Sequence, residues 1–227
     1  MSIRKRLIDA FKQNWLPGLA LQSFALALVI GYYQLPAVGE ACARIGELKV
    51  KYGYLFSALS TSLFGGLIPF LILWGTGQVK QGRALSVGVF YILFWFWKGA
   101  EIDLLYRIQV ILFGEGTGAP TIIRKVLVDQ FGYNLFYAVL CIAIFNLWKE
   151  NNFSLGASRT ALNRPFFTEV VPSMLFSTWL IWLPTTAIVY SMPTPLQIPL
   201  FCIVLCFYVL LITIIGTKGK RILENET

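Results

Sequence analysis

Four stretches without a charged residue, each of more than 20 residues, constrain this chain more than any other feature. They cover residues 16–38, 53–75, 170–191 and 196–216. An α-helix of about 20 residues crosses the roughly 30 Å hydrocarbon core of a bilayer and satisfies its backbone hydrogen bonds internally. The chain is therefore predicted to be all-α, a polytopic transmembrane helix bundle.

Two further stretches qualify as spans although they contain charged residues. Residues 126–148 are apolar except for polar side chains near their start, and residues 84–113 carry charges in their middle. The composition agrees, because 13% charged residues is about half the share of a soluble domain. We predict five to six spans in one membrane domain, residues 1–227, with a basic amphipathic lead-in over residues 1–15.

Missing residue types exclude several kinds of chemistry. The chain has no histidine, so a His-based metal site and a Ser/His or Cys/His nucleophile are excluded. Cys202 and Cys206 lie one helical turn apart, but they are better interpreted as packing residues than as soft-metal ligands. A membrane-embedded enzyme would need Lys98, Glu101 and Asp129 to converge. We expect no catalytic, cofactor-binding or metal site, and hence no enzyme.

The distribution of Lys and Arg predicts how the chain is oriented. With six spans, the amino terminus, the connections 76–83 and 149–169 and the carboxyl tail share twelve cations. The connections 39–52, 98–125 and 192–195 share seven. Both termini are therefore expected on the cytoplasmic or matrix side. The net charge of +8 then reflects basic flanks near anionic lipids and requires no nucleic-acid partner.

Polar residues inside the 126–148 span form a candidate site. At about 100° per residue, several of them share one helix face: Asp129, Gln130, Tyr133, Asn134, Tyr137 and Cys141. In a structural interpretation, these residues hydrogen-bond across helices and Asp129 pairs with Arg124 or Lys125. In a functional interpretation, they line a solute path together with Ser173 and Ser177 of the next span.

Charged residues inside the 84–113 span form a second group. Lys98 and Glu101 are three residues apart, and Asp103 and Arg107 are four apart, so each pair can form an ion pair on a helix. The two pairs lie on opposite faces. We therefore predict either a helix break near Gly99 or a helix enclosed by others all round, and we prefer the break. Lys98 and Glu101 are placed as a charged mouth near the membrane boundary, with the second pair solvated.

The last two spans are predicted to form a helical hairpin. The turn over residues 192–196 contains two prolines, which force a tight return. Pro184, close to Trp182, leaves the backbone carbonyl near Leu180 without its usual donor. A kink there either exposes backbone to a cavity or shapes the packing.

A family resemblance is carried by the stretch RKVLVDQFGY at residues 124–133. It resembles the K-x-x-x-D-Q-x-x-x-x-P segment of the Mpv-seventeen / peroxisomal membrane protein twenty-two family. Lys125, Asp129 and Gln130 match by position, and the family's proline is replaced by Leu135 or Asn134. The residues Trp182-Leu-Pro184 and Met192-Pro193 are similar to the family's W-P-x-x-Q and V-P elements, and residues 7–17 are similar to its short basic helix ending in proline.

The resemblance implies a distant, bacterial or organellar member of a family of small multispanning proteins of peroxisomal and mitochondrial inner membranes. It also implies non-selective or weakly selective channels for small solutes, with effects on metabolite or nucleotide supply and redox balance. We therefore predict channel-like passage of small solutes or ions. The alternative is a non-transporting structural or assembly protein. The expected partners are the lipid bilayer and small solutes, and association into a homo-oligomer is left open.

Overall fold

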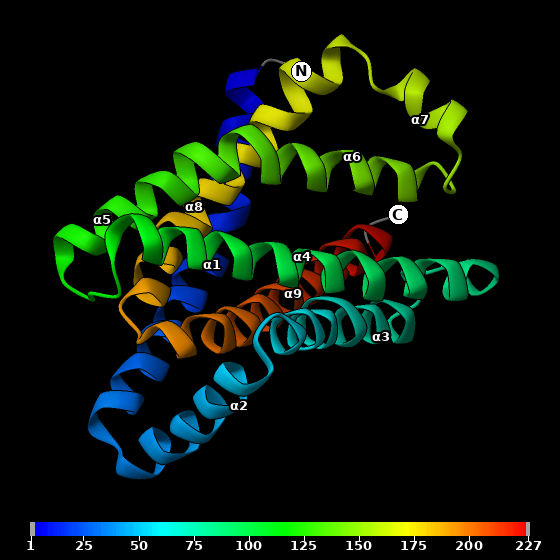
Figure 1. Cartoon of the computed structure of the whole chain (residues 1–227). Helices are drawn as coiled ribbons and strands as arrows, with labels where there is room; N and C mark the ends of the chain where they lie inside the picture. The colour runs from blue at the N-terminus through cyan, green and yellow to red at the C-terminus, as the bar shows by residue number, and fades with distance from the viewer. Residues whose placement is uncertain (1–2, 226–227) are drawn as a thin grey trace. The chain divides into compact units, whose positions relative to one another are not determined.

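A computed structural model describes residues 3–225, and almost all of them are helical, with no strand in this part of the chain (Figure 1). Five helical segments are long and apolar enough to cross a membrane, and a sixth apolar helix is shorter: Asn14–Gln34, Pro36–Gly75, Ala84–Phe113, Ala119–Glu150, Phe166–Tyr190 and the shorter Thr194–Val209. The prediction of an all-α membrane protein with five to six spans is confirmed, and the chain is an integral membrane protein.

The chain folds into two compact units that are interleaved in sequence. The first unit comprises residues 1–23 and 116–191, and the second comprises residues 24–115 and 192–227. Helix α1 (Ile3–Gln34) contributes to both units. The predicted membrane domain thus consists of two units, each with its own internal packing.

The first unit is built around α8. Besides the start of α1, its elements are α5 (Ala119–Leu127), η3 (Val128–Ala138), α6 (Val139–Glu150), α7 (Leu155–Ala161), η4 (Phe166–Val170) and α8 (Val171–Tyr190). Helix α8 packs against α5, η3 and α6. The segments η3 and η4 are π-helical and run directly into α6 and α8, so two long helices each contain a widened stretch.

The second unit is built around α4. Besides the end of α1, its elements are α2 (Pro36–Thr61), η1 (Ser62–Leu67), α3 (Ile68–Gly75), η2 (Gln81–Arg83), α4 (Ala84–Phe113) and α9 (Thr194–Asn225). Helix α4 runs along α2 and η1, and α9 packs against α2, η1 and α3. The side chains of α9 up to Val209 belong to the described part, and many of them are buried.

Helix α4 is continuous, so the predicted break near Gly99 is wrong. A Cβ atom at Gly99 would lie 2.4 Å from the backbone oxygen of Ser57, and one at Gly66 would lie 2.8 Å from that of Tyr91. These glycines let the backbones of α2, η1 and α4 approach closely, as small residues do between membrane helices. Gly99 is therefore a packing residue. The alternative of a helix enclosed by others all round is wrong as well, because α4 packs against α2 and η1 but exposes many apolar side chains elsewhere, such as Leu93 and Ile111.

The connection predicted over residues 39–52 is also wrong, because this segment is helical. Helix α2 begins at Pro36, which suits the first turn of a helix. It bends at Gly53, where φ is 53° and ψ is −123°. Figure 1 shows the blue-to-cyan helix changing direction between its label and the segment leading to α3. Charged residues on the first part of α2 are thus carried on a helix that precedes the long apolar segment.

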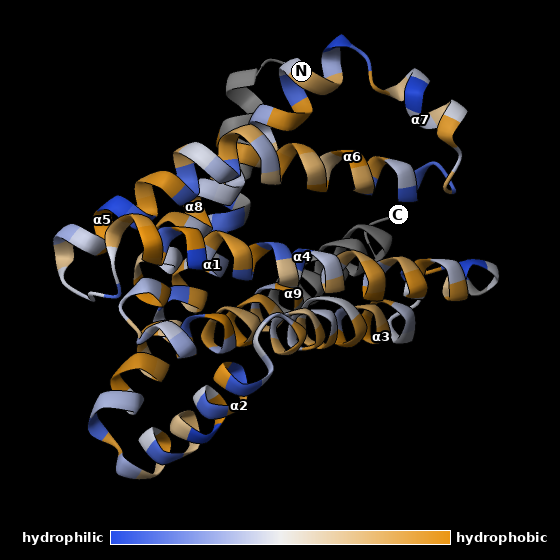
Figure 2. Cartoon of the chain, viewed as in Figure 1, coloured by the Kyte–Doolittle hydropathy of each residue, from blue (hydrophilic) through white to orange (hydrophobic). Residues whose placement is uncertain are grey.

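Hydrophilic residues lie beside the apolar spans, where the sequence predicts polar, basic flanks (Figure 2). In Figure 2, α6 is largely orange, whereas blue, hydrophilic residues gather on the first part of α2 and on α7. The lead-in predicted over residues 1–15 is part of α1 from Ile3 onward, and its residues 1–2 lie outside the described chain. The first span therefore continues a helix that starts well before it.

Candidate functional site

The first unit holds a buried polar network centred on η3. Asp129, Gln130 and Asn134 are all buried there. Their segment is a π-helix, whose backbone hydrogen bonds join residues five apart and whose turn is wider than that of an α-helix. Such segments are frequent at functional sites. We call this set, with the residues of α8 that contact it, the η3–α8 network.

Asp129 accepts hydrogen bonds on both carboxylate oxygens. The Tyr190 hydroxyl donates to Oδ2 at 2.7 Å, and the Gln130 side-chain amide donates to Oδ1 at 2.9 Å. Lys125, one turn earlier and also buried, has its Nζ 5.9 Å from the centroid of the Tyr190 ring. A carboxylate in a membrane helix is therefore surrounded by donors from its own helix and from α8.

Gln130 is the main link between η3 and α8. Its amide nitrogen also donates to the Thr186 hydroxyl at 3.1 Å, and its side-chain oxygen accepts from the Asn134 amide at 2.9 Å. The indole nitrogen of Trp179 donates to the Gln130 backbone oxygen at 3.0 Å. The amide hydrogens of Gln130 are thus both used within the network, as expected for polar side chains that join membrane helices.

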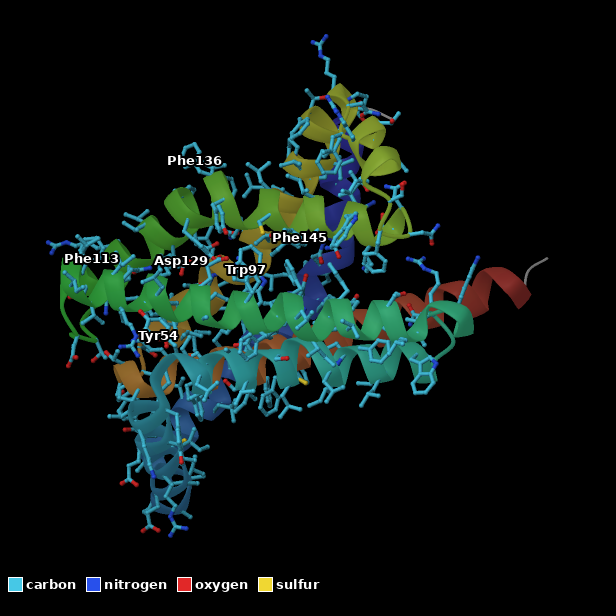
Figure 3. All side chains as sticks on the ribbon, turned by 45° about the vertical axis from the view of Figure 1, so that its right-hand side comes forward. Tyr54, Trp97, Phe113, Asp129, Phe136 and Phe145 are labelled. Carbon is cyan, nitrogen blue, oxygen red and sulfur yellow. The ribbon has the colours of Figure 1, made fainter. Side chains whose placement is uncertain are left out.

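Only some of the residues predicted to share the polar face are buried in the structure. Tyr133 and Cys141 are half-buried, but Tyr137 is 42% exposed. The predicted face assumed α-helical spacing throughout, and the wider turn of η3 rotates the later residues away from it. The adjacent Phe136 is exposed and projects away from the ribbon in Figure 3, in which Asp129 is also labelled. The placement of Tyr137 on that inner face is therefore wrong.

The two serines predicted to extend the path make local contacts. The Ser173 hydroxyl donates to the backbone oxygen of Glu169 at 2.7 Å, and that of Ser177 donates to the backbone oxygen of Ser173 at 3.0 Å. Ser177 also accepts from the Asn14 amide at 3.3 Å. Both serines are half-buried, and their described hydrogen bonds link them to α1 and to their own helix. None of those bonds joins them to Asp129.

The predicted hairpin kink has little effect on α8. Pro184 lies inside this helix, which nevertheless runs without a break from Val171 to Tyr190. Pro184 is exposed and Trp182 is half-buried. Pro184 is thus on the exposed side of an unbroken α8, and the described hydrogen bonds that join α8 to η3 come from other residues of α8.

The second unit holds a separate ionic network centred on Asp103. The Lys49 Nζ donates to Oδ2 at 2.8 Å, the Ser57 hydroxyl donates to the same oxygen at 3.0 Å, and the Arg107 Nε donates to Oδ1 at 3.2 Å. The predicted pair of Asp103 and Arg107 is confirmed. The prediction that it is solvated is wrong for Asp103, which is 3% exposed because α2 covers it.

This ionic network brackets the bend of α2. Lys49 precedes Gly53 by four residues and Ser57 follows it by four. The Lys49 Nζ donates to the Gly53 backbone oxygen at 3.3 Å, and the Ser57 hydroxyl, whose hydrogen is shared with the closer Asp103, lies 3.4 Å from the same oxygen. One carboxylate oxygen of Asp103 thus binds a residue from each side of the bend. We call Lys49, Ser57, Asp103 and Arg107 the Asp103 network.

The predicted pair of Lys98 and Glu101 is confirmed. Lys98 is only 1% exposed, and its Nζ also lies 5.7 Å from the centroid of the Trp97 ring. The two residues were predicted as a charged mouth near the membrane boundary. They lie near the middle of α4 in the second unit, while Asp129 belongs to the first unit.

Cysteines and acids form no recognisable metal site in the described residues, where no three potential ligands come together. The Cys202 sulfur lies 3.3 Å from the Thr61 hydroxyl and 3.6 Å from that of Ser60. These contacts agree with Cys202 as a small, buried packing residue.

Sequence reasoning missed several residues of these networks: Lys49, Ser57, Thr186 and Tyr190. Ser57, Thr186 and Tyr190 lie in the uncharged stretches, where such side chains do not stand out, and Lys49 was assigned to the predicted connection 39–52. The one available signal was spacing, because Lys49 and Ser57 flank Gly53 symmetrically.

Comparison with known protein families, with curated proteins and with solved structures gives no match.

Proposed function

We propose that this integral membrane protein allows small solutes or ions to pass across its membrane. The observation that carries the proposal is a set of buried ionisable side chains inside segments long enough to span: Lys49, Lys98, Asp103, Lys125 and Asp129. Charged groups are costly in a bilayer and commonly mark solute or ion pathways. Their number in so short a chain favours transport over a purely passive anchor.

The η3–α8 network is the proposed place where the path is controlled. A π-helical segment carries Asp129 and Gln130, and such segments are frequent at functional sites. The resemblance of Lys125, Asp129 and Gln130 to the Mpv-seventeen motif also supports a channel. In this proposal, rearranged hydrogen bonds around Gln130 would let solutes reach the Asp129 carboxylate.

A second candidate function is a non-transporting structural or assembly role. The observation that favours it is that Asp129, Gln130 and Asn134 form hydrogen bonds with one another and with α8. Side chains that join helices in this way stabilise a bundle without lining a path. The two functions differ in a single measurable property, the passage of solutes.

The test is solute and ion flux through liposomes that contain the purified full chain. Wild type is compared with Asp129→Asn, which keeps the side-chain shape but removes the charge, and with Gln130→Leu. Glu115→Gln is the matched control, because Glu115 is an exposed acid in the connection after α4. We expect flux from wild type, altered ion selectivity in Asp129→Asn, and no change in the control. Folded wild type without flux would favour the structural role.

The proposed orientation places both termini on the cytoplasmic or matrix side of a bacterial inner membrane or an organelle membrane. Three of the cations assigned to the opposite side, Lys49, Lys98 and Lys125, are buried within helices. Buried, partnered cations contribute little to the loop charge on which orientation depends. Without these three cations, the count for the opposite side falls from seven to four, against twelve for the side of the termini.

A further inference from the structure

Arg107 is an exposed charge on an apolar stretch of α4. Its side chain is 47% exposed, and the surrounding α4 residues are exposed and apolar: Leu104, Ile108, Ile111 and Leu112. Arg107 lies six residues before the end of α4 at Phe113, a distance of about 9 Å along a helix. If α4 spans the membrane, this guanidinium lies beside lipid, within reach of the headgroup level.

The charge of Arg107 is not fully balanced within the Asp103 network. That network places two cations, Lys49 and Arg107, around one carboxylate. Lys49 makes the shorter contact, at 2.8 Å against 3.2 Å for Arg107. The network therefore has a net charge of +1, and the exposed part of that charge is the arginine. A net charge beside lipid is costly unless an anion accompanies it.

The guanidinium is fixed in one orientation. Its Nε is bound to Asp103, and its central carbon lies over the Tyr54 ring, 4.4 Å from the ring centroid. A Cβ at Gly53 would lie 3.4 Å from Nη2, so the absence of a side chain there leaves this edge uncrowded. Among the described residues, no hydrogen bond from either Nη group is found. Both Nη groups, with two N–H donors each, are thus positioned and available.

We propose that Arg107 binds a phosphate group, supplied by the headgroup of a membrane lipid. A planar guanidinium presents paired N–H donors whose geometry matches phosphate oxygens, and such contacts are stronger than neutral hydrogen bonds. Asp103 and Tyr54 are positioning residues, because they orient the guanidinium without meeting the phosphate. The same chemistry would also accept a free phosphate, so the source is decided by experiment. This inference does not depend on solute passage.

The test measures lipid retained by the purified full chain in detergent, by native mass spectrometry and by titration with fluorescent phosphatidylglycerol. Diacylglycerol, which lacks phosphate, is the comparison lipid. The variants are Arg107→Gln, Arg107→Lys and Tyr54→Leu. The matched control is Arg44→Gln, which removes an exposed cation from α2 in the same unit. Each protein is first checked for the same helix content as wild type.

We expect Arg107→Gln to weaken phosphatidylglycerol binding by about ten- to a hundredfold, the factor that a charge-assisted hydrogen bond provides. Tyr54→Leu and Arg107→Lys should weaken it by less, because a positive charge remains in both. Arg107→Lys loses the planar guanidinium, and Tyr54→Leu loses the ring that orients it. Arg44→Gln should leave it unchanged. Equal losses in Arg44→Gln and Arg107→Gln, or equal retention of diacylglycerol, would overturn the proposal.

The source of the phosphate is decided by adding inorganic phosphate to the labelled complex. A lipid site keeps its phosphatidylglycerol at millimolar phosphate, whereas a site for free phosphate releases it. If Arg107→Gln does not fold, Tyr54→Leu still decides the matter, because a simple surface charge predicts no loss of binding when only the ring is removed.

Discussion

At the scale of single residues, Asp103 illustrates why a buried charge needs its whole set of partners. Its carboxylate accepts from Lys49, Ser57 and Arg107. Removing one member of a buried ion pair leaves the other charged group in a medium of low dielectric constant. Removing Asp103 would therefore destabilise the protein mainly because Lys49 would stay buried without a counter-ion, and less because the attraction of the ion pair itself is lost.

We expect Asp103→Ala to destabilise the protein by about 3–5 kcal/mol, because Lys49 remains buried without its counter-ion. Thermal unfolding in detergent, followed by circular dichroism, measures the loss. Glu115→Ala removes an exposed acid and should change little. A melting temperature of Asp103→Ala equal to that of Glu115→Ala would show that Lys49 finds another partner.

Tyr190 offers a smaller change at the same scale. Tyr190→Phe removes the hydroxyl that donates to Asp129 at 2.7 Å and keeps the ring near Lys125. Hydrogen bonds between membrane helices contribute on average about 0.6 kcal/mol and at most roughly 1.7 kcal/mol, so we expect a loss in that range. The same unfolding measurement applies, with Tyr52→Phe, an exposed tyrosine, as the control. A loss no larger than the control's would exclude a stabilising bond.

At the scale of elements, the bend of α2 is enforced by backbone geometry as well as by the Asp103 network. Gly53 has a positive φ of 53° with a ψ of −123°, a combination that side chains with a Cβ rarely adopt. We expect Gly53→Ala to cost about 1–3 kcal/mol in the free energy of unfolding. Gly31→Ala is the matched control, because a Cβ there would make only an ordinary contact with Val38 at 3.8 Å.

The outcome for Gly53→Ala separates two causes of the bend. If the glycine enforces it, distances between spin labels on the two parts of α2 should change in Gly53→Ala and stay unchanged in Gly31→Ala. If the side chains of Lys49 and Asp103 dominate, the bend persists and only stability falls. An unchanged distance together with unchanged stability would contradict the strained geometry at Gly53.

The elements show what a sequence can and cannot predict here. Long uncharged runs required helices and located the spans well, because a bilayer admits few alternatives. The helical segment before Gly53 was missed because charged residues in that stretch resembled a loop. The π-helix η3 was missed because apolar periodicity cannot reveal a widened turn. Gly99 was interpreted as a break because a glycine alone does not distinguish flexibility from close packing.

The polar residues of the candidate site were predicted where they share one helical segment, but their partners on neighbouring helices were not. Asp129, Gln130 and Asn134 were found because polar residues stand out in an apolar run, and the pairs within α4 followed from helical spacing. Lys49 and Tyr190 were not found because their roles depend on which helix packs beside them. That pairing is a tertiary property, and none of the residues involved is unusual in its own segment.

At the scale of the whole molecule, the alternation of spans determines which connections share a side of the membrane. The segment ending at Gly75 and the segments Ala84–Phe113 and Ala119–Glu150 each cross once if all span. Gln78 and Gly156 then lie on one side and Glu115 on the other. Cations near Gln78 and near Gly156 are more numerous than those near Glu115, so the first side should be cytoplasmic or matrix.

Single cysteines introduced at these three exposed positions test this arrangement in a variant whose four native cysteines are replaced, Cys202 by serine and the others by alanine. In sealed vesicles, a membrane-impermeant maleimide added outside should modify Gln78→Cys and Gly156→Cys together or Glu115→Cys alone, depending on vesicle orientation. Modification of all three from one side before the vesicles are opened would mean that neither α4 nor the segment Ala119–Glu150 crosses. In that case the buried Lys98, Asp103, Lys125 and Asp129 would all lie on helices outside the bilayer, where burying their charges carries no cost from lipid.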